Sequence, residues 1–387
     1  MSLTPLALRL SENIRAHGPV PFSSFMGAAL YDAEFGYYSA AAGRTGKAGD
    51  FFTSVSVGPV FGELMAGQFC QVWEMTGRPA EFTVMEAGAN DGGFAADVLN
   101  WAQKHRPDFY QALRYQIDEM LPSVMERQRI ALAAHGEKVT HDLISAAPCG
   151  CYFANEVLDA MPFRRVRFSG GEWRELMVGL AENGDFHWVE QEPEDRALKR
   201  RLAWLGQDFA EGYTTEIAPA VASQIRYAAS RLEKGVLFFA DYGYSAADYY
   251  SESRTAGTLR CYRRHQAHEN PFNDVGETDI TAHVDFSLAA TAAVAAGCGV
   301  AGFLDQSRFL TGAAETVLRS MDGNVSPEAA LWHRQFRTLT HPAHLGQNFH
   351  FLVLEKGMPD MAPLSGLKFA RSSNAEELLL PAFAPRH

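Results

Sequence analysis

Short apolar runs alternate with amphipathic helical stretches along most of the chain, and this alternation predicts a wound α/β fold. Strand-like runs lie at residues 82–85, 114–119, 138–140, 151–154, 236–240, 300–304 and 348–356. Helical patterns separate most of these runs, as crossovers between parallel strands require. The sequence therefore predicts one wound sheet of seven strands.

The first 80 residues are predicted to form a helical lobe. Thr4 can cap a first helix that Gly18 ends, and a second helical pattern covers residues 21–38. A polar loop over residues 49–58 precedes a third helix and is a candidate lid. Three aromatic residues are expected to pack this lobe on the main sheet, namely Tyr31, Tyr37 and Tyr38.

A stretch of alternating apolar and polar residues interrupts the wound pattern. Strands are expected at residues 164–168, 173–178 and 186–190, followed by a charged helix over residues 194–205, which together form an insertion. The expected regions are the N-terminal lobe with its lid loop (1–80), the first half of the sheet (81–162), the inserted meander and helix as a substrate lobe (163–217), the second half of the sheet (218–357) and a tail (358–387).

Composition places the 387 residues among ordinary globular proteins, with 47% hydrophobic and 21% charged residues. A formal net charge of -12, without a long basic run, argues against nucleic acid or an anionic membrane as the main partner. The longest low-charge stretch, residues 286–302, is too short to cross a bilayer, and no signal peptide is recognisable. Because the five cysteines are scattered, a reducing compartment is expected. These features predict a cytoplasmic location.

Two groups of residues resemble parts of a zinc site. Cys149 and Cys151 lie downstream of His141, and His265 lies close to His268. Neither group has further ligands at a suitable spacing, so buried thiols are the favoured interpretation and no metal is predicted.

A glycine-rich turn follows the first strand of the predicted sheet. Glu86 ends the strand, and Gly88, Gly92 and Gly93 precede an apolar helix. Strand, glycine turn and helix together can cradle a nucleotide, because glycine lets the backbone approach a ligand and the helix start offers free N–H groups. The glycine spacing lacks the G-x-G-x-x-G of dinucleotide folds, although a dehydrogenase stays an alternative. An acidic residue here suits S-adenosylmethionine, which carries an ammonium group and ribose hydroxyls.

Later strands also end in polar residues. Glu119 follows the second strand, where doubly wound sheets bind ribose hydroxyls; a shift of one position would give this role to Asp118. The cofactor contacts we expect are Asp50, Thr53, Ser54, Glu86, Gly88, Ala89, Asn90, Gly92, Glu119, Asp142 and Asn155.

The fourth strand ends in a group of polar residues that includes Glu156 and Asp159. Asn155 could simply cap a helix that follows the strand. If a helical turn begins there, the two carboxylates share one side of it and can face one planar cation. The number of polar groups exceeds what one cap needs, which favours a functional site.

Several blocks resemble the MidA-like family. They are Gly49-Asp-Phe-x-Thr-Ser, Gly58-Pro-x-Phe-Gly-Glu63, Glu86-x-Gly-Ala, Ala154-Asn-Glu with Asp159-Ala-x-Pro162, Asp241-Tyr-Gly243, Gly257-Thr-Leu-Arg-Cys-Tyr262 and Asp279-Ile-Thr-Ala-His-Val-Asp-Phe286. The resemblance implies a class I, Rossmann-like methyltransferase sheet of seven strands with a final antiparallel pair, and S-adenosylmethionine as cofactor. One departure is Asn90, which stands where the family has a glycine; Asn tolerates a left-handed backbone better than other side chains do.

Mitochondrial members of this family are arginine methyltransferases that assist assembly of respiratory complex I. The resemblance therefore implies methylation of an arginine in a partner protein, possibly a complex I subunit. Carboxylates would orient the guanidinium, with Glu156 and Asp159 as first candidates and Asp285 and His283 as weaker ones. An assembly chaperone that has kept the fold and lost the chemistry is the alternative.

Overall fold

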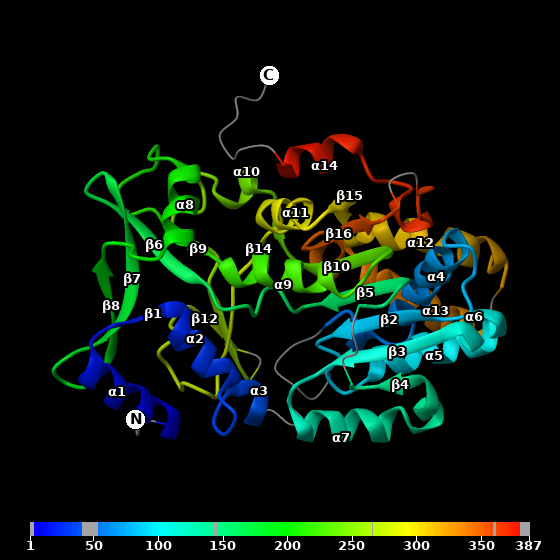
Figure 1. Cartoon of the computed structure of the whole chain (residues 1–387), viewed down its shortest axis with the longest axis horizontal. Helices are drawn as coiled ribbons and strands as arrows, with labels where there is room; N and C mark the ends of the chain where they lie inside the picture. Colours follow the sequence, from blue (N-terminus) through cyan, green and yellow to red (C-terminus); the bar gives the residue numbers. More distant parts are fainter. Residues whose placement is uncertain are drawn as a thin grey trace.

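The strands that the apolar runs predict assemble into one mixed sheet, which a computed structural model places at the core of the chain (Figure 1). The structure describes residues 4–40, 53–142, 146–264, 266–324, 326–358 and 361–379. The strands follow the order β15 (Cys298–Asp305), β16 (Phe349–Lys356), β10 (Gly235–Tyr244), β5 (Gly150–Asn155), β2 (Phe82–Ala87), β3 (Leu113–Asp118) and β4 (Val139–Thr140).

Strand direction in this sheet confirms the predicted class I fold. The five strands from β10 to β4 are parallel, whereas β16 is antiparallel to both β10 and β15. A short additional strand, β14 (Val284–Asp285), pairs with the end of β10. Because the carboxylate of Asp285 accepts the Leu288 N–H, helix α11 (Phe286–Ala295) begins only after it.

Helices bury both faces of the main sheet, which explains its continuous apolar strands. β2, for example, is buried along its entire length. The ring of Phe94 in α5 (Gly93–His105) stacks on the ring of Phe153 in β5, with the ring centroids 4.3 Å apart. One layer contains α4 (Val60–Met75), α5, α12 (Gln306–Ser320) and α13 (Pro327–Thr340), and the other contains α9 (Pro219–Ser230), α11 and α14 (Ser372–Leu379).

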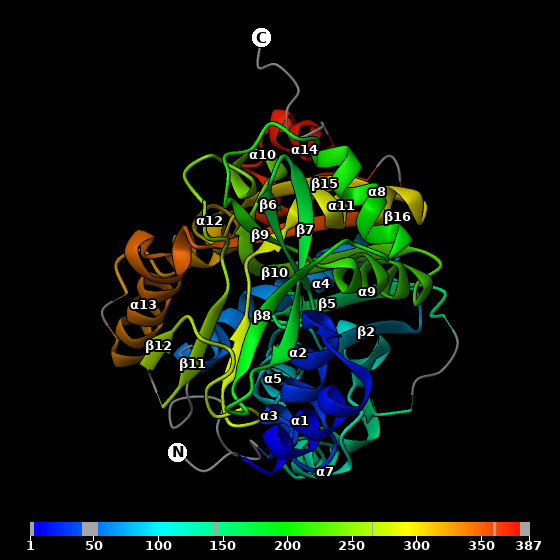
Figure 2. The ribbon, with the colours of Figure 1, turned by 90° about the vertical axis from the view of Figure 1, so that its left-hand side faces the viewer.

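A second sheet contains the predicted meander (Figure 2). The meander consists of β6 (Arg164–Ser169), β7 (Glu172–Leu180) and β8 (Phe186–Gln191), and helix α8 (Arg196–Leu205) follows it. All four elements lie close to the predicted limits. Two further strands were not predicted, β1 (Val20–Pro21) and β9 (Thr214–Ile217), because each is too short to show a period. Residues from the N-terminal lobe and from the insertion therefore share one sheet.

The N-terminal lobe begins with α1 (Pro5–His17), which Thr4 caps and Gly18 ends as predicted. The predicted second helix is divided into α2 (Phe22–Tyr31) and α3 (Tyr37–Ala40), because Asp32 accepts the N–H groups of Glu34 and Phe35.

The lobe packs on the second sheet. Phe22 contacts Phe163 and Trp188, with ring centroids 5.2 and 4.9 Å away. The predicted packing on the main sheet is wrong: among the described residues, the hydrophobic cluster around the lobe includes no main-sheet strand.

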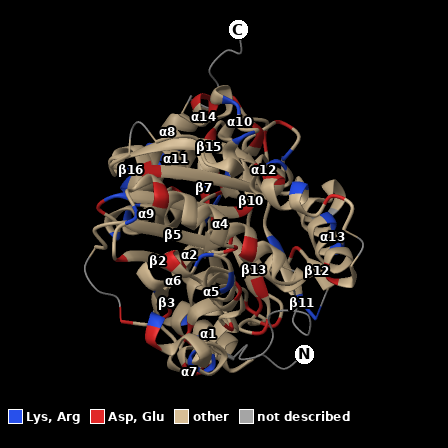
Figure 3. Cartoon of the chain, turned by 90° about the vertical axis from the view of Figure 1, so that its right-hand side faces the viewer, with Lys and Arg blue, Asp and Glu red and all other residues tan. Residues whose placement is uncertain are grey.

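A third, small sheet contains β12 (Gln266–His268), β11 (Arg260–Arg263) and β13 (Asp279–Thr281), in this order. On the right-hand side of the molecule, basic and acidic residues are mixed over the elements (Figure 3). Within the described ranges, no helix combines the length and the apolar character needed to span a membrane.

Candidate active site

A cavity of about 1530 Å³ lies at the carboxyl ends of β2, β3, β5 and β10. This is the edge at which open α/β sheets bind ligands. The main-sheet strand ends, the N-terminal lobe and the three-stranded sheet all contribute lining residues. Since small-molecule pockets usually measure roughly 300–1000 Å³, the cavity has room for more than one ligand.

The glycine turn forms the wall at the end of β2. Gly88, Asn90 and Gly92 have φ values of 69°, 48° and 85°, so the expected left-handed conformation of Asn90 is confirmed. A Cβ atom on Gly88 would lie 2.6 Å from Val157 Cγ2, which leaves no room for a larger residue. Gln128, which is completely buried, fixes the turn by donating from Nε2 to the Asn90 carbonyl at 2.9 Å.

The turn residues have different positions relative to the cavity. Gly88, Ala89 and Asn90 line it, whereas Gly92 is not among its described lining residues and directly precedes α5. Asp91, a lining residue that we did not single out, accepts the Gly93 N–H at 3.0 Å.

Glu86 lies next to the last residue of β2 and lines the cavity. The Tyr115 hydroxyl donates to its Oε2 at 2.6 Å. Burial raises the pKa of Glu86 to about 8, although the Tyr115 hydrogen bond opposes the shift. Its charge near neutral pH therefore depends on the ligand that binds beside it.

Asp118 and Glu119 both line the cavity at the end of β3, which ends one residue earlier than predicted. Glu119 Oε1 accepts the N–H groups of Met120 and Leu121 at 2.8 and 2.9 Å. Burial raises the pKa of Glu119, against the effect of these two hydrogen bonds. The geometry leaves both carboxylates available as ribose contacts.

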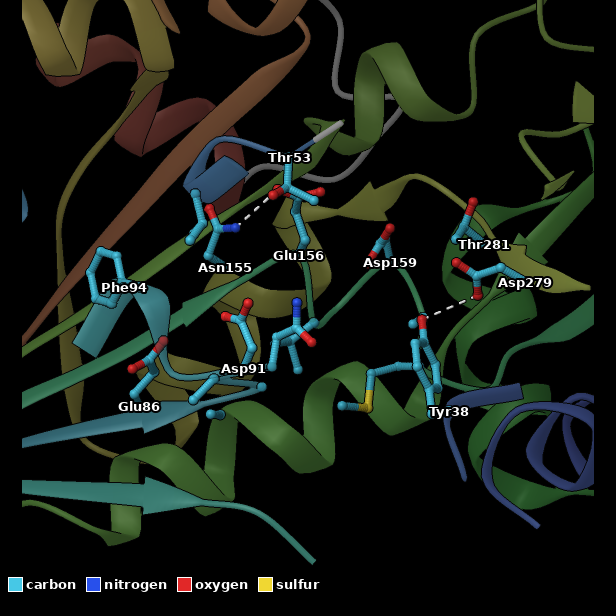
Figure 4. Close-up of a pocket in the computed structure, with 18 of the residues that line it drawn as sticks. Tyr38, Thr53, Glu86, Asp91, Phe94, Asn155, Glu156, Asp159, Asp279 and Thr281 are labelled. Carbon is cyan, nitrogen blue, oxygen red and sulfur yellow. Dashed lines mark hydrogen bonds between the residues drawn. The ribbon is translucent and has the colours of Figure 1, made fainter. Parts of the chain in front are cut away.

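The end of the predicted lid loop reaches the cavity beside Asn155 and Glu156 (Figure 4). Thr53 lines it, whereas Ser54 is buried behind it and donates its N–H to Glu156 Oε1 at 3.3 Å. Asp50 lies outside the described residues. Asp142 is exposed at the end of β4 and, within the described part of the chain, does not line the cavity.

The residues after β5 form a turn, and the helical turn that the sequence left open does not begin here. Oδ2 of Asp241 accepts three successive N–H groups, from Val157, Leu158 and Asp159, at 3.1, 2.8 and 3.3 Å. Glu156 has a φ of 54°, which is rare for a residue with a side chain and marks a strained position. Because no helix begins here, Asn155 is not a helix cap.

Glu156 and Asp159 nevertheless both line the cavity (Figure 4). Asn155 Nδ2 donates to Glu156 Oε1 at 3.0 Å, while Asn155 Oδ1 and Asp159 Oδ1 are buried without a hydrogen-bond partner. No described Lys or Arg forms an ion pair with either carboxylate. Unpaired acceptors in a cavity indicate a ligand that donates hydrogen bonds.

Charge accumulates at this end of the cavity. Burial, and then the charge of Asp159, raises the pKa of Glu156 to about 8. Burial also raises the pKa of Asp159, and burial with the charges of Asp159 and Glu156 raises that of Asp241. A bound cation would oppose these shifts and favour the charged forms of the carboxyls.

The two weaker candidates differ in position. His283 lines the cavity with an unpartnered Nδ1, and burial followed by the charges of Arg254 and Arg260 lowers its pKa to about 4, so the ring is neutral. Asp285 is not among the described lining residues. Its carboxylate caps α11, forms an ion pair with Arg201 of α8 and accepts the Tyr250 hydroxyl at 2.9 Å.

Sequence reasoning missed several lining residues of the acceptor end. Tyr38, expected only to pack the lobe, donates its hydroxyl to Asp279 Oδ1 at 3.1 Å. Asp279 and Thr281 belong to the block of residues 279–286, of which we selected only Asp285 and His283. The signal was present, but without a fold nothing distinguished the two acidic residues of the block.

Comparisons with known proteins agree with this geometry. Residues 64–304 match a family described as "Putative S-adenosyl-L-methionine-dependent methyltransferase". The mitochondrial protein arginine methyltransferase NDUFAF7 homolog of Drosophila melanogaster is 27% identical, over 91% of this chain and 85% of that protein. NDUFAF7 of Rattus norvegicus is 24% identical over 91% of this chain and 84% of that protein.

A protein from Burkholderia thailandensis, solved with S-adenosyl-homocysteine bound, is 32% identical to this chain and superposes with a TM-score of 0.86. The alignment covers 95% of this chain and 96% of that one. The cytoplasmic location predicted above is contradicted, since the curated relatives are named as mitochondrial proteins.

The residues of the cavity fit S-adenosylmethionine. Asn155 Oδ1 is a buried acceptor without a partner, and the carboxylates after β3 can accept from hydroxyls. The individual cofactor contacts stay predictions. The fold, the match over residues 64–304 and the Burkholderia thailandensis relative together show that the chain belongs to the MidA-like family of S-adenosylmethionine-dependent methyltransferases.

Proposed function

We propose that this methyltransferase methylates the guanidinium group of an arginine in a partner protein. The observation that carries the proposal is the pair of half-buried carboxylates after β5, Glu156 and Asp159, with Asp159 Oδ1 buried and unpartnered. The curated relatives, which are named protein arginine methyltransferases, support the same acceptor.

A guanidinium matches this site in charge and in shape. It offers five N–H donors in one plane and remains charged at all physiological pH values. Two carboxylates on one side of the cavity can therefore hold it through charge-assisted hydrogen bonds. We propose that Glu156 and Asp159 concentrate its positive charge away from the nitrogen that receives the methyl group.

When bound, S-adenosylmethionine supplies a methyl group activated by its sulfonium. The acceptor nitrogen must attack in line with the breaking bond, so the protein mainly orients the partners and excludes water. We propose that Glu156 Oε2 takes the proton that the guanidinium nitrogen loses. Oε1 is already held by the Ser54 N–H and by Asn155 Nδ2, which fixes the orientation of the carboxylate.

The other lining residues among our candidates are assigned to the cofactor. We propose that Thr53, Glu86, Gly88, Ala89, Asn90, Glu119 and Asn155 hold the cofactor. We further propose that the acceptor protein is a respiratory complex I subunit, as the family resemblance implies.

The test is transfer of a labelled methyl group from S-adenosylmethionine to proteins of cells that lack this protein. We expect labelled methylarginine after hydrolysis of the acceptor, and mass spectrometry identifies the acceptor. Label on another residue type would contradict the arginine assignment. If the parent transfers no label yet restores assembly in these cells, the protein is a chaperone.

A further inference from the structure

A relay of hydrogen bonds leads from the helices that follow β15 to the carboxylate of Glu156. Gln306, the first residue of α12, donates from Nε2 to the Leu339 carbonyl at 3.0 Å and accepts the Ser54 hydroxyl on Oε1 at 3.1 Å. The N–H of Ser54 in turn donates to Glu156 Oε1 at 3.3 Å. Ser54 and Gln306 are both 0% exposed, so solvent does not reach their side chains.

The amide of Gln306 fits its two partners in only one orientation. Leu339 belongs to the last turn of α13, where carbonyl groups have no N–H partner within the helix, so its oxygen needs an external donor. The amide nitrogen of Gln306 meets this need, and the amide oxygen is then the atom that accepts the Ser54 hydroxyl. The end of α13 therefore fixes which atom of Gln306 faces Ser54.

Further contacts hold the turn that carries Ser54. The Thr53 N–H donates to Ser56 Oγ at 2.9 Å, and the Ser56 hydroxyl donates to the Thr53 carbonyl at 2.8 Å. The 3-10 helix η1 (Val55–Val57) follows, and its two valines pack against the hydrophobic core on one face of the main sheet. The Ser54 N–H is therefore held in a fixed position beside Glu156.

Glu156 is held at its backbone and at one oxygen of its side chain. Its N–H donates to the Ala240 carbonyl at 3.0 Å, and its φ of 54° persists only because the surrounding structure imposes it. Both hydrogen bonds that described residues donate to its carboxylate, from the Ser54 N–H and from Asn155 Nδ2, end on Oε1. Oε2 is the oxygen left for the acceptor.

We propose that Gln306 and Ser54 are positioning residues for methyl transfer, which hold Oε1 of Glu156 so that Oε2 faces the nitrogen that receives the methyl group. This inference rests on the proposed function, in which Glu156 takes the proton that the guanidinium loses. In this assignment Ser54 acts through Glu156 rather than by contact with the cofactor.

Titration of the Glu156 carboxyl tests the relay without any acceptor. Burial, and then the charge of Asp159, raises the pKa of Glu156 to about 8, so the titration falls in an accessible pH range. Carbon-13 NMR of protein labelled at the glutamate side-chain carboxyls follows it, and the resonance lost in Glu156→Gln identifies Glu156. Gln306→Met keeps most of the size of the side chain and removes both hydrogen bonds. Because a hydrogen bond to the charged form favours that form, this variant should move the midpoint to higher pH.

Gln68→Met is the matched control. Gln68 is 1% exposed, donates from Nε2 to Ser365 Oγ at 2.8 Å and accepts the Gly366 N–H on Oε1 at 3.0 Å. The same substitution therefore removes two hydrogen bonds of a buried glutamine, although Gln68 is not among the described lining residues of the cavity. The Glu156 midpoint in this control should equal that of the parent.

A double-mutant cycle tests the consequence for methyl transfer. The probe is the protein extract of cells that lack this protein, with labelled S-adenosylmethionine at a saturating concentration. Gln306→Met should lower the initial transfer rate roughly tenfold, because a displaced carboxylate misaligns the acceptor. In the Glu156→Gln background it should change the rate by less than about twofold, since the group that it positions is already disabled. Calorimetry should show parental affinity for S-adenosylhomocysteine in all of these variants.

The outcomes separate this inference from the proposed function. An unchanged or lowered midpoint in Gln306→Met overturns the relay, even if arginine methylation is demonstrated. Equal fold losses of transfer in both backgrounds overturn the positioning role, because Gln306 then acts independently of Glu156. If Gln306→Met does not fold, Ser54→Ala replaces it with the same expectations. A parent protein that labels no arginine instead contradicts the proposed function, while the carboxyl titration still decides the relay.

Discussion

At the end of β2 the cavity wall depends on backbone conformation, whereas at the end of β5 it depends on buried charge. The glycine turn has three left-handed residues and a carbonyl fixed by Gln128. The turn after β5 holds two half-buried carboxyl groups with raised pKa values, and the Asp159 Oδ1 atom has no hydrogen-bond partner. The first end is held in place by the backbone and Gln128, whereas the carboxyls of the second end hold protons until a bound cation favours their charged forms. Substitutions at the two ends should therefore have different consequences.

The largest effect is expected from Glu156→Gln and Asp159→Asn. Both variants keep the shape of the side chain and remove its charge, so methyl transfer should fall by roughly 100-fold or more. Transfer of labelled methyl to the acceptor measures this loss, and calorimetry should show nearly parental affinity for S-adenosylmethionine. Glu192→Gln, at a side chain that is 82% exposed, is the control. Parental transfer rates in both variants would mean that the acceptor binds elsewhere.

Gly88→Val should affect only the end of the cavity at β2, where the cofactor is proposed to bind. A side chain at this position is strained at φ 69° and approaches Val157 Cγ2. We therefore expect the free energy of cofactor binding to weaken by about 1–3 kcal/mol while the protein stays folded. Calorimetry measures the affinity, and circular dichroism checks the fold. Gly67→Ala is the control, since a Cβ atom there meets nothing within 4 Å. Equal affinity of Gly88→Val and parent would remove the turn from the cofactor site.

Glu119→Ala should weaken cofactor binding by roughly 1.5–3 kcal/mol, the range for hydrogen bonds to a charged group. The same titration of Asp118→Ala decides between the two carboxylates at the end of β3. If only Asp118→Ala binds more weakly, Asp118 is the ribose contact. If neither variant differs from the parent, the end of β3 does not contact the cofactor.

The last prediction concerns stability and pH. Because burial raises the pKa of Glu156 to about 8, the folded state holds a proton that the unfolded state releases above a pKa of about 4.5. The free energy of unfolding should therefore decrease as pH rises through this interval, by at most about 1.4 kcal/mol per pH unit from this group. Urea unfolding between pH 5 and 8 should show a smaller decrease for Glu156→Gln than for the parent. Parallel pH profiles would argue against a buried, protonated Glu156.

The main sheet could be predicted because each strand is covered on both faces and is therefore apolar throughout, as in β2 and β5. The cofactor turn could be predicted because glycines mark left-handed positions. The acceptor end could be predicted only in part. Glu156 and Asp159 follow a strand directly, but Tyr38 and Asp279 are brought together by packing between parts of the chain that are 241 positions apart.

Two interpretations of the sequence differ from the structure because contacts between distant parts of the chain decide the outcome. Residues 155–162 lack a helix because the carboxylate of Asp241, far away in the sequence, accepts the N–H groups that a helix would have used. The lobe packs on the second sheet because Phe22 finds its aromatic partners there. Neither partner could be identified from a local pattern.

The position of β16 has a consequence for synthesis of the chain on the ribosome. This strand, Phe349–Lys356, is the last of the main sheet to be made, yet it lies between β15 and β10 and pairs with both. Until it emerges, β10 and β15 each present an unpaired, apolar edge, which is the type of edge that promotes aggregation. Nascent chains that stop before residue 349 should therefore depend on chaperones, whereas chains that include β16 can close the sheet.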